Sequence, residues 1–406
     1  MKNVLAIGCA YPPELQYFAR GIAKVGARLY AVDQPPEEHL PAHVRECLSG
    51  YCQIDSLFDE QAAFDAVRKR FGSMTFDRIE SLWEPTVLLA AKLREAFGTP
   101  GLNYEQVLRF RDKDKMKQAV AAAGLRTPRH QRATTPEECF EAAEAVGYPA
   151  CIKPIAGAGS ADTFRVDSKS DLEKALKKAG HHDEYNVEEF IEAEEFTYDT
   201  ISIDGKIVFE NIAWYRPRPL IARSVQWISP QTISLREYDA PQYAAGRELG
   251  HGVLKALEHE SGFAHMEWYR LADGEVVFGE IASRPPGAHT VDTMNFASDI
   301  DLFTGWADAV VNGKFDLEFE RLYNCAIIFK RATGQGYIQR IEGVGQILAE
   351  FGPHIPCIDL LPIGAHRRNW VQTLLSDGFV FVRHPDLQAT CDIADRVGTD
   401  IQMYAA

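Results

Sequence analysis

The sequence contains no run of about 18 apolar residues, which is the length that a membrane-spanning helix needs. This absence argues against a protein that crosses a membrane through helices. The N-terminal segment MKNVLAIGCAYPP has a short apolar run, but no small-residue cleavage site follows it, so no signal peptide is expected. We therefore predict a cytoplasmic protein without a targeting signal or a membrane partner.

Basic residues are fewer than acidic residues in this sequence. The chain has 43 lysine and arginine residues against 58 aspartate and glutamate residues, so its formal net charge is −15. This balance disfavours a general binder of nucleic acid, because phosphate backbones attract basic proteins. Local lysines can still bind a small anion.

Motifs of two common kinds are also missing. The eight cysteines are scattered, with neither a CxxC pair nor a Cys/His cluster at zinc spacing. Several lie in apolar segments, where a thiol usually acts as a small hydrophobic group. No GxGxxG motif follows the first predicted strand, so a dinucleotide site of that kind is not supported.

What the sequence does provide is enough chain for several modules. Its 406 residues exceed one ordinary domain. Over residues 1–110, strand patterns alternate with helix patterns, which predicts an open parallel sheet. Glu84 stands at the carboxyl end of the predicted strand FDRIESLWE, where such sheets place their ligand crevice. A ligand role for Glu84 and an ordinary strand end both fit.

A β-hairpin is predicted in GFAHMEWYRLADGEVVFGEIASRPPG, residues 262–287, because Asp-Gly between two strand patterns favours a two-residue turn. Like charges directly opposite each other on such a hairpin are destabilising, and a hard cation held by carboxylate oxygens would relieve them. We therefore predict a Mg²⁺ site beside Arg284, with solvated glutamates as the alternative. With Asp273 and Gly274 as the turn, the cross-strand pairs are Ala272–Glu275, Trp268–Gly279 and Glu267–Glu280.

Two upstream segments contain lysines. Residues 104–124 are predicted as one helix, with charges clustered from Arg111 to Lys115. Further on, YPACIKPIAGAGSADTFRV is predicted as a strand ending near Lys153, a loop of small residues at 154–161 and a second strand. Glycines in such a loop can place N–H groups over a phosphate, while the lysine adds a point charge. An ordinary hairpin loop is the other interpretation.

Taken in order, these features resemble the ATP-grasp superfamily of carboxylate–amine ligases over about residues 80–320. The resemblance implies an α/β and α+β multidomain fold, with an N-terminal open parallel α/β sheet, a two-part ATP-grasp α+β module and a C-terminal α+β extension. The units are then an N-terminal domain, a small subdomain with the phosphate loop, a large subdomain with the metal hairpin, and the extension, at residues 1–110, 111–190, 191–320 and 321–406.

The resemblance also assigns a nucleotide site. RDKDKMKQAVAAAGLRTP is similar to the family's first nucleotide-lysine region, where the distance to Gly124 selects Lys113 rather than Lys115. In YPACIKPIAGAGS, Lys153 corresponds to the phosphate lysine. NVEEFIEAEEFT resembles the hinge that holds adenine. The assigned residues are Gly157, Gly159 and Ser160 in a closing lid, Glu188 with the backbones of Glu189 and Ile191 at the base, and Glu195 at the ribose hydroxyls.

HMEWYRLADGEVVFGEIASR is similar to the family's metal hairpin. It makes Glu267 and Glu280 ligands of Mg²⁺ and places Arg284 on the γ-phosphate or the acyl phosphate. The family usually has an asparagine two residues after the second glutamate, whereas this chain has Ala282. One oxygen ligand is thus missing, and Ser283 or a water is its expected replacement.

In GEIASRPPGAH and the C-terminal extension, the chain looks most like the L-amino acid ligase group. The resemblance implies an enzyme that uses ATP and Mg²⁺ to activate a carboxylate as an acyl phosphate and to join it to an amine, releasing ADP and phosphate. Its partners are then small-molecule carboxylate and amine substrates, with amino acids expected. Arg284 and Lys153 are the candidate catalytic residues, and Glu84, Arg284 and His289 are candidate substrate contacts. A homodimer is left open.

Two alternatives remain. Another ATP-grasp acceptor, such as bicarbonate in a carboxylase or a nucleotide-biosynthetic amine, fits the same ATP site, although the sequence has no biotinyl-acceptor motif. The second alternative is a non-catalytic ATP-binding sensor, which Ala282 favours.

Overall fold

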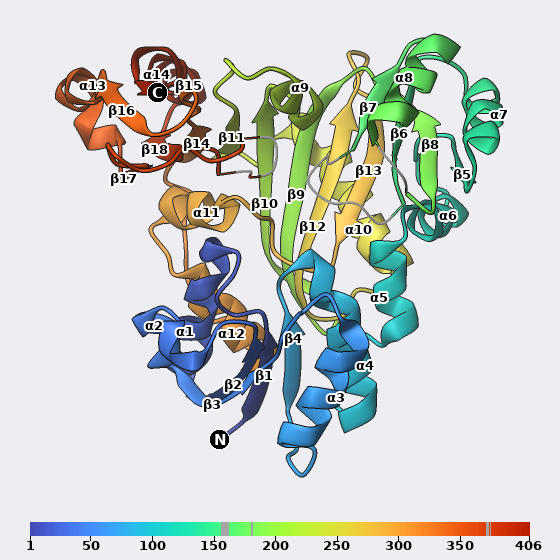
Figure 1. Cartoon of the computed structure of the whole chain (residues 1–406), viewed down its shortest axis with the longest axis vertical. Coiled ribbons are helices and arrows are strands. Elements are labelled where there is room, and N and C mark those ends of the chain that lie inside the picture. The colour runs from blue at the N-terminus through green and yellow to red at the C-terminus, as the bar shows by residue number, and fades with distance from the viewer. Residues whose placement is uncertain (156–161, 180–181, 371–372, 374) are drawn as a thin grey trace.

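The computed structural model describes residues 1–155, 162–179, 182–370, 373 and 375–406 (Figure 1). A parallel sheet at the N-terminus is followed by two antiparallel sheets and one mixed sheet. This arrangement of α/β and α+β parts confirms the predicted fold class. Within the described ranges, no helix combines the length and the apolar character that crossing a membrane requires.

The N-terminal module is an open sheet of four parallel strands in the order β3-β2-β1-β4. Apolar segments such as NVLAI form its centre, where Val4 faces α1 and α2 while Leu5 faces α3 and α4. The predicted parallel sheet is therefore confirmed. Its elements are β1 (Asn3–Ile7), α1 (Gln16–Lys24), β2 (Arg28–Asp33), α2 (Ala42–Arg45), β3 (Leu48–Gln53), α3 (Glu60–Phe71), β4 (Arg78–Ser81) and α4 (Val87–Phe97).

The next segment is two helices rather than the single helix predicted over 104–124. α5 (Tyr104–Arg111) ends at Asp112, which has extended backbone angles, and α6 (Lys113–Ala122) begins directly after it. The Asp112 carboxylate accepts hydrogen bonds from the backbone N–H groups of Asp114 and Lys115. An aspartate that caps a helix start competes with helix continuation, so the continuous pattern was misleading at this position.

A small antiparallel sheet in the order β5-β8-β6-β7 follows, packed against two helices. Its core includes Ile152 and Val187, which are buried on neighbouring strands. The elements are β5 (His130–Ala133), α7 (Pro136–Val146), β6 (Ala150–Pro154), β7 (Phe164–Val166), α8 (Lys169–Ala179) and β8 (Tyr185–Glu189).

An eight-stranded antiparallel sheet in the order β13-β12-β9-β10-β11-β14-β18-β17 forms the centre of the molecule (Figure 1). It runs across residue 320, because the last three strands in this order come from the C-terminal extension. Its strands are β9 (Glu194–Ile203), β10 (Lys206–Arg216), β11 (Gln231–Ser234), β12 (Gly262–Arg270), β13 (Val276–Ala282), β14 (Asn324–Phe329), β17 (Cys357–Leu360) and β18 (Gly378–His384).

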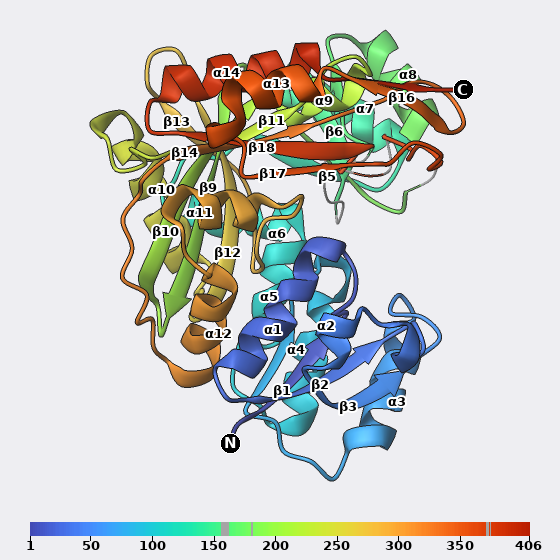
Figure 2. The same ribbon diagram turned by 90° about the vertical axis from the view of Figure 1, so that its left-hand side faces the viewer.

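The remaining helices pack around this sheet, and Figure 2 shows α13 and α14 at the end of the molecule opposite to the N-terminal module. A three-stranded sheet in the order β15-β19-β16 completes the extension. These elements are α9 (Pro219–Ser224), α10 (Ala244–Ala256), α11 (Thr290–Ser298), α12 (Leu302–Asn312), β15 (Thr333–Gly334), β16 (Ile338–Glu342), α13 (Val344–Phe351), α14 (Leu387–Asp400) and β19 (Gln402–Ala405).

The N-terminal module is attached to the large sheet through α1 and α12. The Phe18 ring lies edge-on to Phe303 and Trp306, with ring centres 4.9 and 5.0 Å apart. A Cβ atom at Gly21 would lie 2.3 Å from the Phe303 carbonyl oxygen, so only glycine permits this approach. The attachment fixes the carboxyl end of β4 near the hairpin.

The hairpin β12–β13 pairs Glu267 with Glu280, as predicted, but two other predicted pairs are wrong. Leu271 donates its N–H to the Glu275 carbonyl, so the loop has three residues rather than two. Trp268 consequently pairs with Phe278, and a bulge at Gly279 restores the register before the glutamates. The extra loop residue and the bulge shift the register in opposite directions, so the expected pair of Glu267 and Glu280 still forms.

Candidate active site

Charged side chains converge between the small sheet and the hairpin. Lys153 on β6 and Lys117 on α6 lie with their Nζ atoms 2.6 and 3.0 Å from the two carboxylate oxygens of Glu188 on β8. Nζ of Lys113 is 3.6 Å, and Nζ of Lys153 is 3.8 Å, from Oε2 of Glu280 on β13. Three lysines and two glutamates thus form one cluster.

The break at Asp112 explains where two of these lysines lie. Lys113 is the first residue of α6, and Lys117 follows one turn later on the same face of the helix. Lys117 is fully buried and was not predicted from the sequence. Its spacing of four residues from Lys113 is the signal that could have identified it.

The cluster keeps both carboxylates ionised. Burial alone raises the pKa of Glu188, but Lys117 and Lys153 outweigh burial and lower that pKa to about 2. Burial likewise opposes ionisation of Glu280, and the three lysines lower its pKa to about 2. Burial lowers the pKa of Lys117 to about 8, against the opposing effect of Glu188. The cluster can therefore offer fixed cations to an anionic ligand.

A cavity of about 60 Å³ lies beside this cluster and reaches the predicted adenine hinge. Arg218 donates to Glu195 Oε2 at 2.9 Å and to the Ile191 carbonyl at 2.7 Å. Burial and the nearby Glu267 raise the pKa of Glu195 to about 7, although Arg218 opposes this. The cavity lining includes Lys113, Lys153, Glu188, Glu189, Ile191, Glu195 and Tyr269.

The Glu189 carboxylate is bound by arginines from the preceding segment. It lies 3.2 Å from Nη2 of Arg126 and 3.4 Å from Nε of Arg129. The backbone N–H of Glu189 donates to the Arg129 carbonyl at 2.8 Å. The side chain thus fixes the hinge to the segment before β5.

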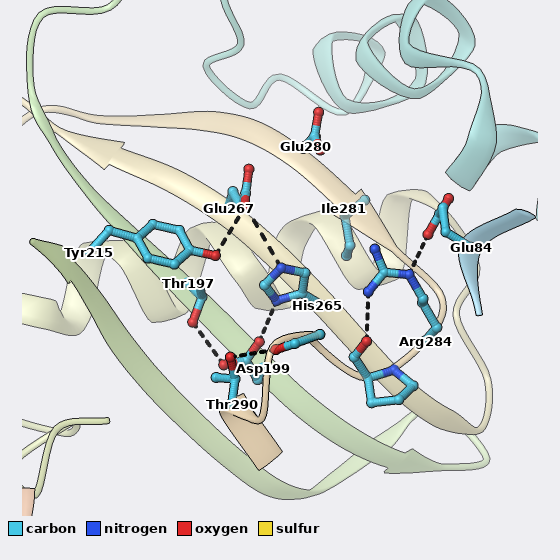
Figure 3. A network of polar contacts seen from close by, with 12 residues as sticks. Glu84, Thr197, Asp199, Tyr215, His265, Glu267, Glu280, Ile281, Arg284 and Thr290 are labelled. Atoms are coloured by element: carbon cyan, nitrogen blue, oxygen red, sulfur yellow. Dashed lines mark hydrogen bonds and ion pairs between the residues drawn. The ribbon is translucent and has the colours of Figure 1, made fainter. Parts of the chain in front are cut away.

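Glu267 lies between Tyr215 and His265 (Figure 3). The Tyr215 hydroxyl donates to Glu267 Oε1 at 3.2 Å, and His265 Nε2 is 3.8 Å from the same oxygen. His265 Nδ1 is 2.6 Å from Asp199, which is fully buried. Burial and then Glu280 raise the pKa of Glu267. Asp199 and Tyr215 were not predicted as site residues, because strands β9 and β10 lie far from the hairpin in sequence. His265 lies on β12 itself, but a lone histidine is more often a packed or surface residue, so it was not assigned a role.

Glu267 and Glu280 offer carboxylate oxygens on the same face of the hairpin. Among the described residues, no group of three or more His, Cys, Asp and Glu side chains is arranged to hold a metal. A cation that takes only one or two protein carboxylates, and completes its shell with phosphate and water, is the kind that fits this donor set. Ala282 lines the large cavity near the glutamates, whereas Ser283 lines a separate cavity, so a water suits the missing ligand better than Ser283.

Arg284 is held by Glu84 of the N-terminal module. Its Nε donates to Glu84 Oε2 at 2.5 Å (Figure 3). Nη1 of Arg111 donates to the other oxygen at 2.7 Å. Burial opposes ionisation of Glu84, but Arg284 and Arg111 outweigh it and lower the Glu84 pKa. Glu84 therefore orients the arginine that was assigned to the phosphate.

A second cavity of about 790 Å³ lies between the N-terminal module, the hairpin and the extension. Glu84, Arg284, Glu267 and Glu280 line it, together with Lys113. Apolar side chains, among them Leu15, Trp83, Met116 and Phe329, supply much of the remaining surface. This volume suits small-molecule substrates.

The other predicted residues have different surroundings. His289 lies between Ala288 and Thr290, which line the large cavity, but its own Nδ1 is 2.7 Å from Asp292 and its ring packs 4.5 Å from that of Phe379. The predicted lid residues Gly157, Gly159 and Ser160 lie outside the described residues.

Residues 118–298 match the family described as the ATP-grasp domain. The chain therefore carries an ATP-grasp domain, which confirms the predicted superfamily. Over 219 residues it is 32% identical to an L-arginine-specific L-amino acid ligase from Bacillus subtilis, and the match covers 52% of each protein. The chain thus spans about half the length of that relative.

Two solved structures share the fold along nearly the whole chain. An L-amino acid ligase from Bacillus licheniformis has a TM-score of 0.82 at 21% identity, covering 100% of this chain and 99% of that one. An N5-carboxyaminoimidazole synthetase from Staphylococcus aureus, complexed with ADP, has a TM-score of 0.72 at 17% identity, covering 96% and 95%. At these identities the likeness establishes the fold.

Proposed function

We propose that this chain is an ATP-dependent, ADP-forming carboxylate–amine ligase. The proposal depends on one observation above all: Lys113, Glu267 and Glu280 line both the lysine cleft and the large cavity. A phosphate bound by the cleft lysines would meet a carboxylate in the large cavity at this junction. Phosphoryl transfer needs positioning and charge neutralisation rather than a protein nucleophile, and the cluster supplies both.

For the nucleotide, Lys113 and Lys153 would bind the phosphates, while Glu188 keeps Lys153 and Lys117 in place through its two oxygens. The backbones of Glu189 and Ile191 would face the base, and Glu195 would accept the ribose hydroxyls. The lid role of Gly157, Gly159 and Ser160 stays a prediction.

Glu267 and Glu280 would hold Mg²⁺. When bound there, Mg²⁺ would neutralise charge on the transferring phosphate. Glu280 stays ionised at neutral pH because the lysines lower its pKa to about 2. Tyr215 and His265 fix the carboxylate of Glu267 from the other side.

The reaction then needs two steps. A substrate carboxylate attacks the γ-phosphorus of ATP, which gives an acyl phosphate and ADP, and an amine displaces phosphate from the acyl carbon. Arg284, oriented by Glu84, would stabilise the negative charge on the acyl phosphate. Enclosure of the cavity would limit hydrolysis of this reactive group.

Amino acids are the substrates that we propose, and the names of the relatives from both Bacillus species support this choice. Bicarbonate or a nucleotide-biosynthetic amine is the second candidate, which the synthetase from Staphylococcus aureus supports. The units 1–110, 111–190, 191–320 and 321–406, the cytoplasmic location and the homodimer stay predictions.

The test is release of ADP with pairs of common amino acids, followed by mass spectrometry of the product. We expect release that requires both an acid and an amine, and a product of the corresponding amide mass. ADP release with bicarbonate and no amino acid would instead favour the second candidate. Calorimetric binding of ATP without turnover on any acid and amine would favour the sensor, which the alanine at 282 allows.

A further inference from the structure

His265 lies beside the alanine that stands where a third oxygen ligand was expected. On the hairpin, His265 pairs directly with Ala282, and the next pair on the same face is Glu267 with Glu280. Directly paired residues, and residues two apart on one strand, present their side chains on the same face of a sheet. All four residues line the large cavity. The His265 ring therefore shares its face with both glutamates and with the small side chain of Ala282.

A row of polar side chains crosses the sheet and ends at this ring. Asn211 on β10 pairs with Asp199 on β9, which in turn pairs with His265 on β12. Asp199 Oδ2 accepts hydrogen bonds from Asn211 Nδ2 at 3.1 Å and from the Thr197 hydroxyl at 2.7 Å (Figure 3). Asn211, Asp199 and Thr197 are fully buried. The Asp199 carboxylate is thus held in one orientation.

Asp199 in turn fixes the His265 ring. His265 Nδ1 lies 2.6 Å from Asp199 Oδ1, and a carboxylate can only accept, so Nδ1 is the donor of this hydrogen bond. Nε2 has no hydrogen bond to a described residue and lies 3.8 Å from Glu267 Oε1 (Figure 3). Around metal sites, a histidine that donates its other ring N–H to a carboxylate is the usual way to orient the imidazole.

The distances favour a role through water rather than direct coordination. Within the described ranges, His265, Glu267 and Glu280 do not form a group that could hold a metal directly. A polar contact longer than 3.5 Å, such as that between His265 and Glu267, commonly has a water between its two atoms. Mg²⁺ keeps several water ligands when only one or two carboxylates bind it. Such a water has O–H groups that a ring nitrogen can accept.

We infer that His265 is a positioning residue of the metal site, whose Nε2 accepts a hydrogen bond from a water ligand of the Mg²⁺ at Glu267 and Glu280. The ring thereby compensates for the missing oxygen at Ala282, and Asp199 keeps it in place. A cation at the glutamates favours the neutral ring that this role needs, because it repels a positive charge on the imidazole. The inference rests on the proposed ligase function, since it needs the Mg²⁺ site of that proposal.

The test uses Mn²⁺ as the probe, because electron paramagnetic resonance distinguishes the free from the bound ion. Mn²⁺ is titrated into the protein with the non-hydrolysable analogue AMP-PNP and without acid or amine, and the analogue alone supplies the baseline. The variants are His265→Ala, Ala282→Asn and the double variant. His39→Ala, at an exposed position of the N-terminal module, is the matched control. Circular dichroism checks the fold of each protein.

We expect His265→Ala to weaken Mn²⁺ binding about tenfold or more, as the loss of an outer-shell partner typically does. Ala282→Asn should restore most of this loss in the double variant, because a carboxamide oxygen can bind the cation itself. In the wild-type background the same asparagine should gain much less, since His265 already holds the water. The two positions are thus expected to be non-additive, and His39→Ala should match the wild type.

Equal Mn²⁺ affinity in His265→Ala and the wild type would overturn the inference, as would a double variant that binds no better than His265→Ala. A gain of about tenfold from Ala282→Asn alone would overturn it too, and this comparison remains valid if His265→Ala does not fold. The ¹⁴N coupling of an imidazole bound directly to Mn²⁺ would overturn the water-mediated arrangement.

These outcomes are separate from the fate of the ligase proposal, because AMP-PNP binding does not require turnover. A wild type that binds no Mn²⁺ would overturn both the metal site and the role of His265. The expected pattern of Mn²⁺ affinities without ADP release on any acid and amine would remove the ligase function and leave that role. Turnover with Mn²⁺ binding that ignores both positions would do the reverse.

Discussion

In the lysine cleft each lysine lies within 3.8 Å of a glutamate, whereas in the large cavity Glu84 is paired with Arg284 and Arg111 and apolar side chains supply much of the remaining lining. The cleft charges compensate one another before any ligand binds. In the large cavity, one oxygen of the buried Glu14 has no hydrogen-bond partner among the described residues. If the cleft binds the nucleotide as proposed, its cationic groups are positioned before the nucleotide arrives, while the substrate has to complete the large cavity.

The two regions also differ in origin. The cleft is built from short sequence motifs on α6, β6, β8 and the hairpin. The cavity draws its lining from the N-terminal module, the loops after β10 and the C-terminal extension. A site of the second kind can change its selectivity by substitutions in any of these parts while the cleft stays as it is.

The largest expected effect comes from breaking the cleft. Lys153→Ala removes a phosphate-binding cation and leaves Glu188 with Lys117 alone. We expect ADP formation to fall by about a thousandfold, because charge neutralisation of the phosphates supplies rate factors of that order. Coupled ADP release measures the rate, and circular dichroism checks the fold.

Lys177→Ala is the control for this substitution, since Lys177 lies on α8 of the same subdomain with its side chain 74% exposed. Its rate should equal that of the wild type. Near-normal turnover in Lys153→Ala would mean that the cluster is not the phosphate site.

Much of the cleft could be predicted from the sequence, because Lys113, Lys153, Glu267 and Glu280 lie in short motifs whose order along the chain resembles that of the family. The parallel N-terminal sheet was equally accessible, since buried strands alternate with amphipathic helices. The roles of these residues remain predictions. Their convergence is what the structure adds.

What could not be predicted depends on exceptions to local rules or on long-range packing. Asp112 interrupts a continuous helical pattern, and the bulge at Gly279 compensates a loop that is one residue longer than expected. The contact between Glu84 and Arg284 joins residues 200 positions apart. Part of the lining of the large cavity comes from the segment after β10, which has no recognisable motif, so no local signal marks it.

A smaller effect is expected at the boundary between the two sites. Glu84→Gln should lower kcat by about tenfold to a hundredfold with a smaller change in KM, because a neutral amide holds the Arg284 guanidinium less firmly and a small misplacement near the chemistry is costly. Steady-state kinetics at saturating ATP measure both constants. Glu105→Gln, at an exposed position on α5, is the control. If KM alone rises, Glu84 acts on substrate binding and not on the arginine.

The hairpin bulge should matter for stability first. A Cβ atom at residue 279 would lie 2.8 Å from the Glu267 carbonyl oxygen, so Gly279→Ala forces the strands apart. We expect the free energy of unfolding to fall by about 1–3 kcal/mol, the usual cost of overpacking, and the activity to fall because Glu280 moves relative to Glu267. Urea denaturation measures the stability change. Gly345→Ala has open space around it and should be neutral or slightly stabilising; a similar loss there would argue against a specific role of the bulge.

The smallest expected effect concerns the stability of the fold and neither of the two sites. The His259 side chain is buried, with its Nε2 3.2 Å from the Phe263 carbonyl oxygen. Burial lowers its pKa to about 4 from an ordinary 6.5. The unfolded chain therefore binds the extra proton more readily between these values. The free energy of unfolding should fall as the pH drops through this window, by at most about 1.4 kcal/mol per pH unit.

In His259→Gln this contribution to the slope should disappear, and the difference between variant and wild type isolates it from other titrating groups. Denaturant unfolding at a series of pH values measures the slope, and ADP release at pH 7 should change little because His259 touches neither the cleft nor the large cavity. An unchanged slope would place the acid sensitivity elsewhere. Glu188 and Glu280 add acid sensitivity of their own at lower pH, because their pKa of about 2 in the folded protein lies below the ordinary value of 4.5, so the comparison with His259→Gln is made above about pH 5.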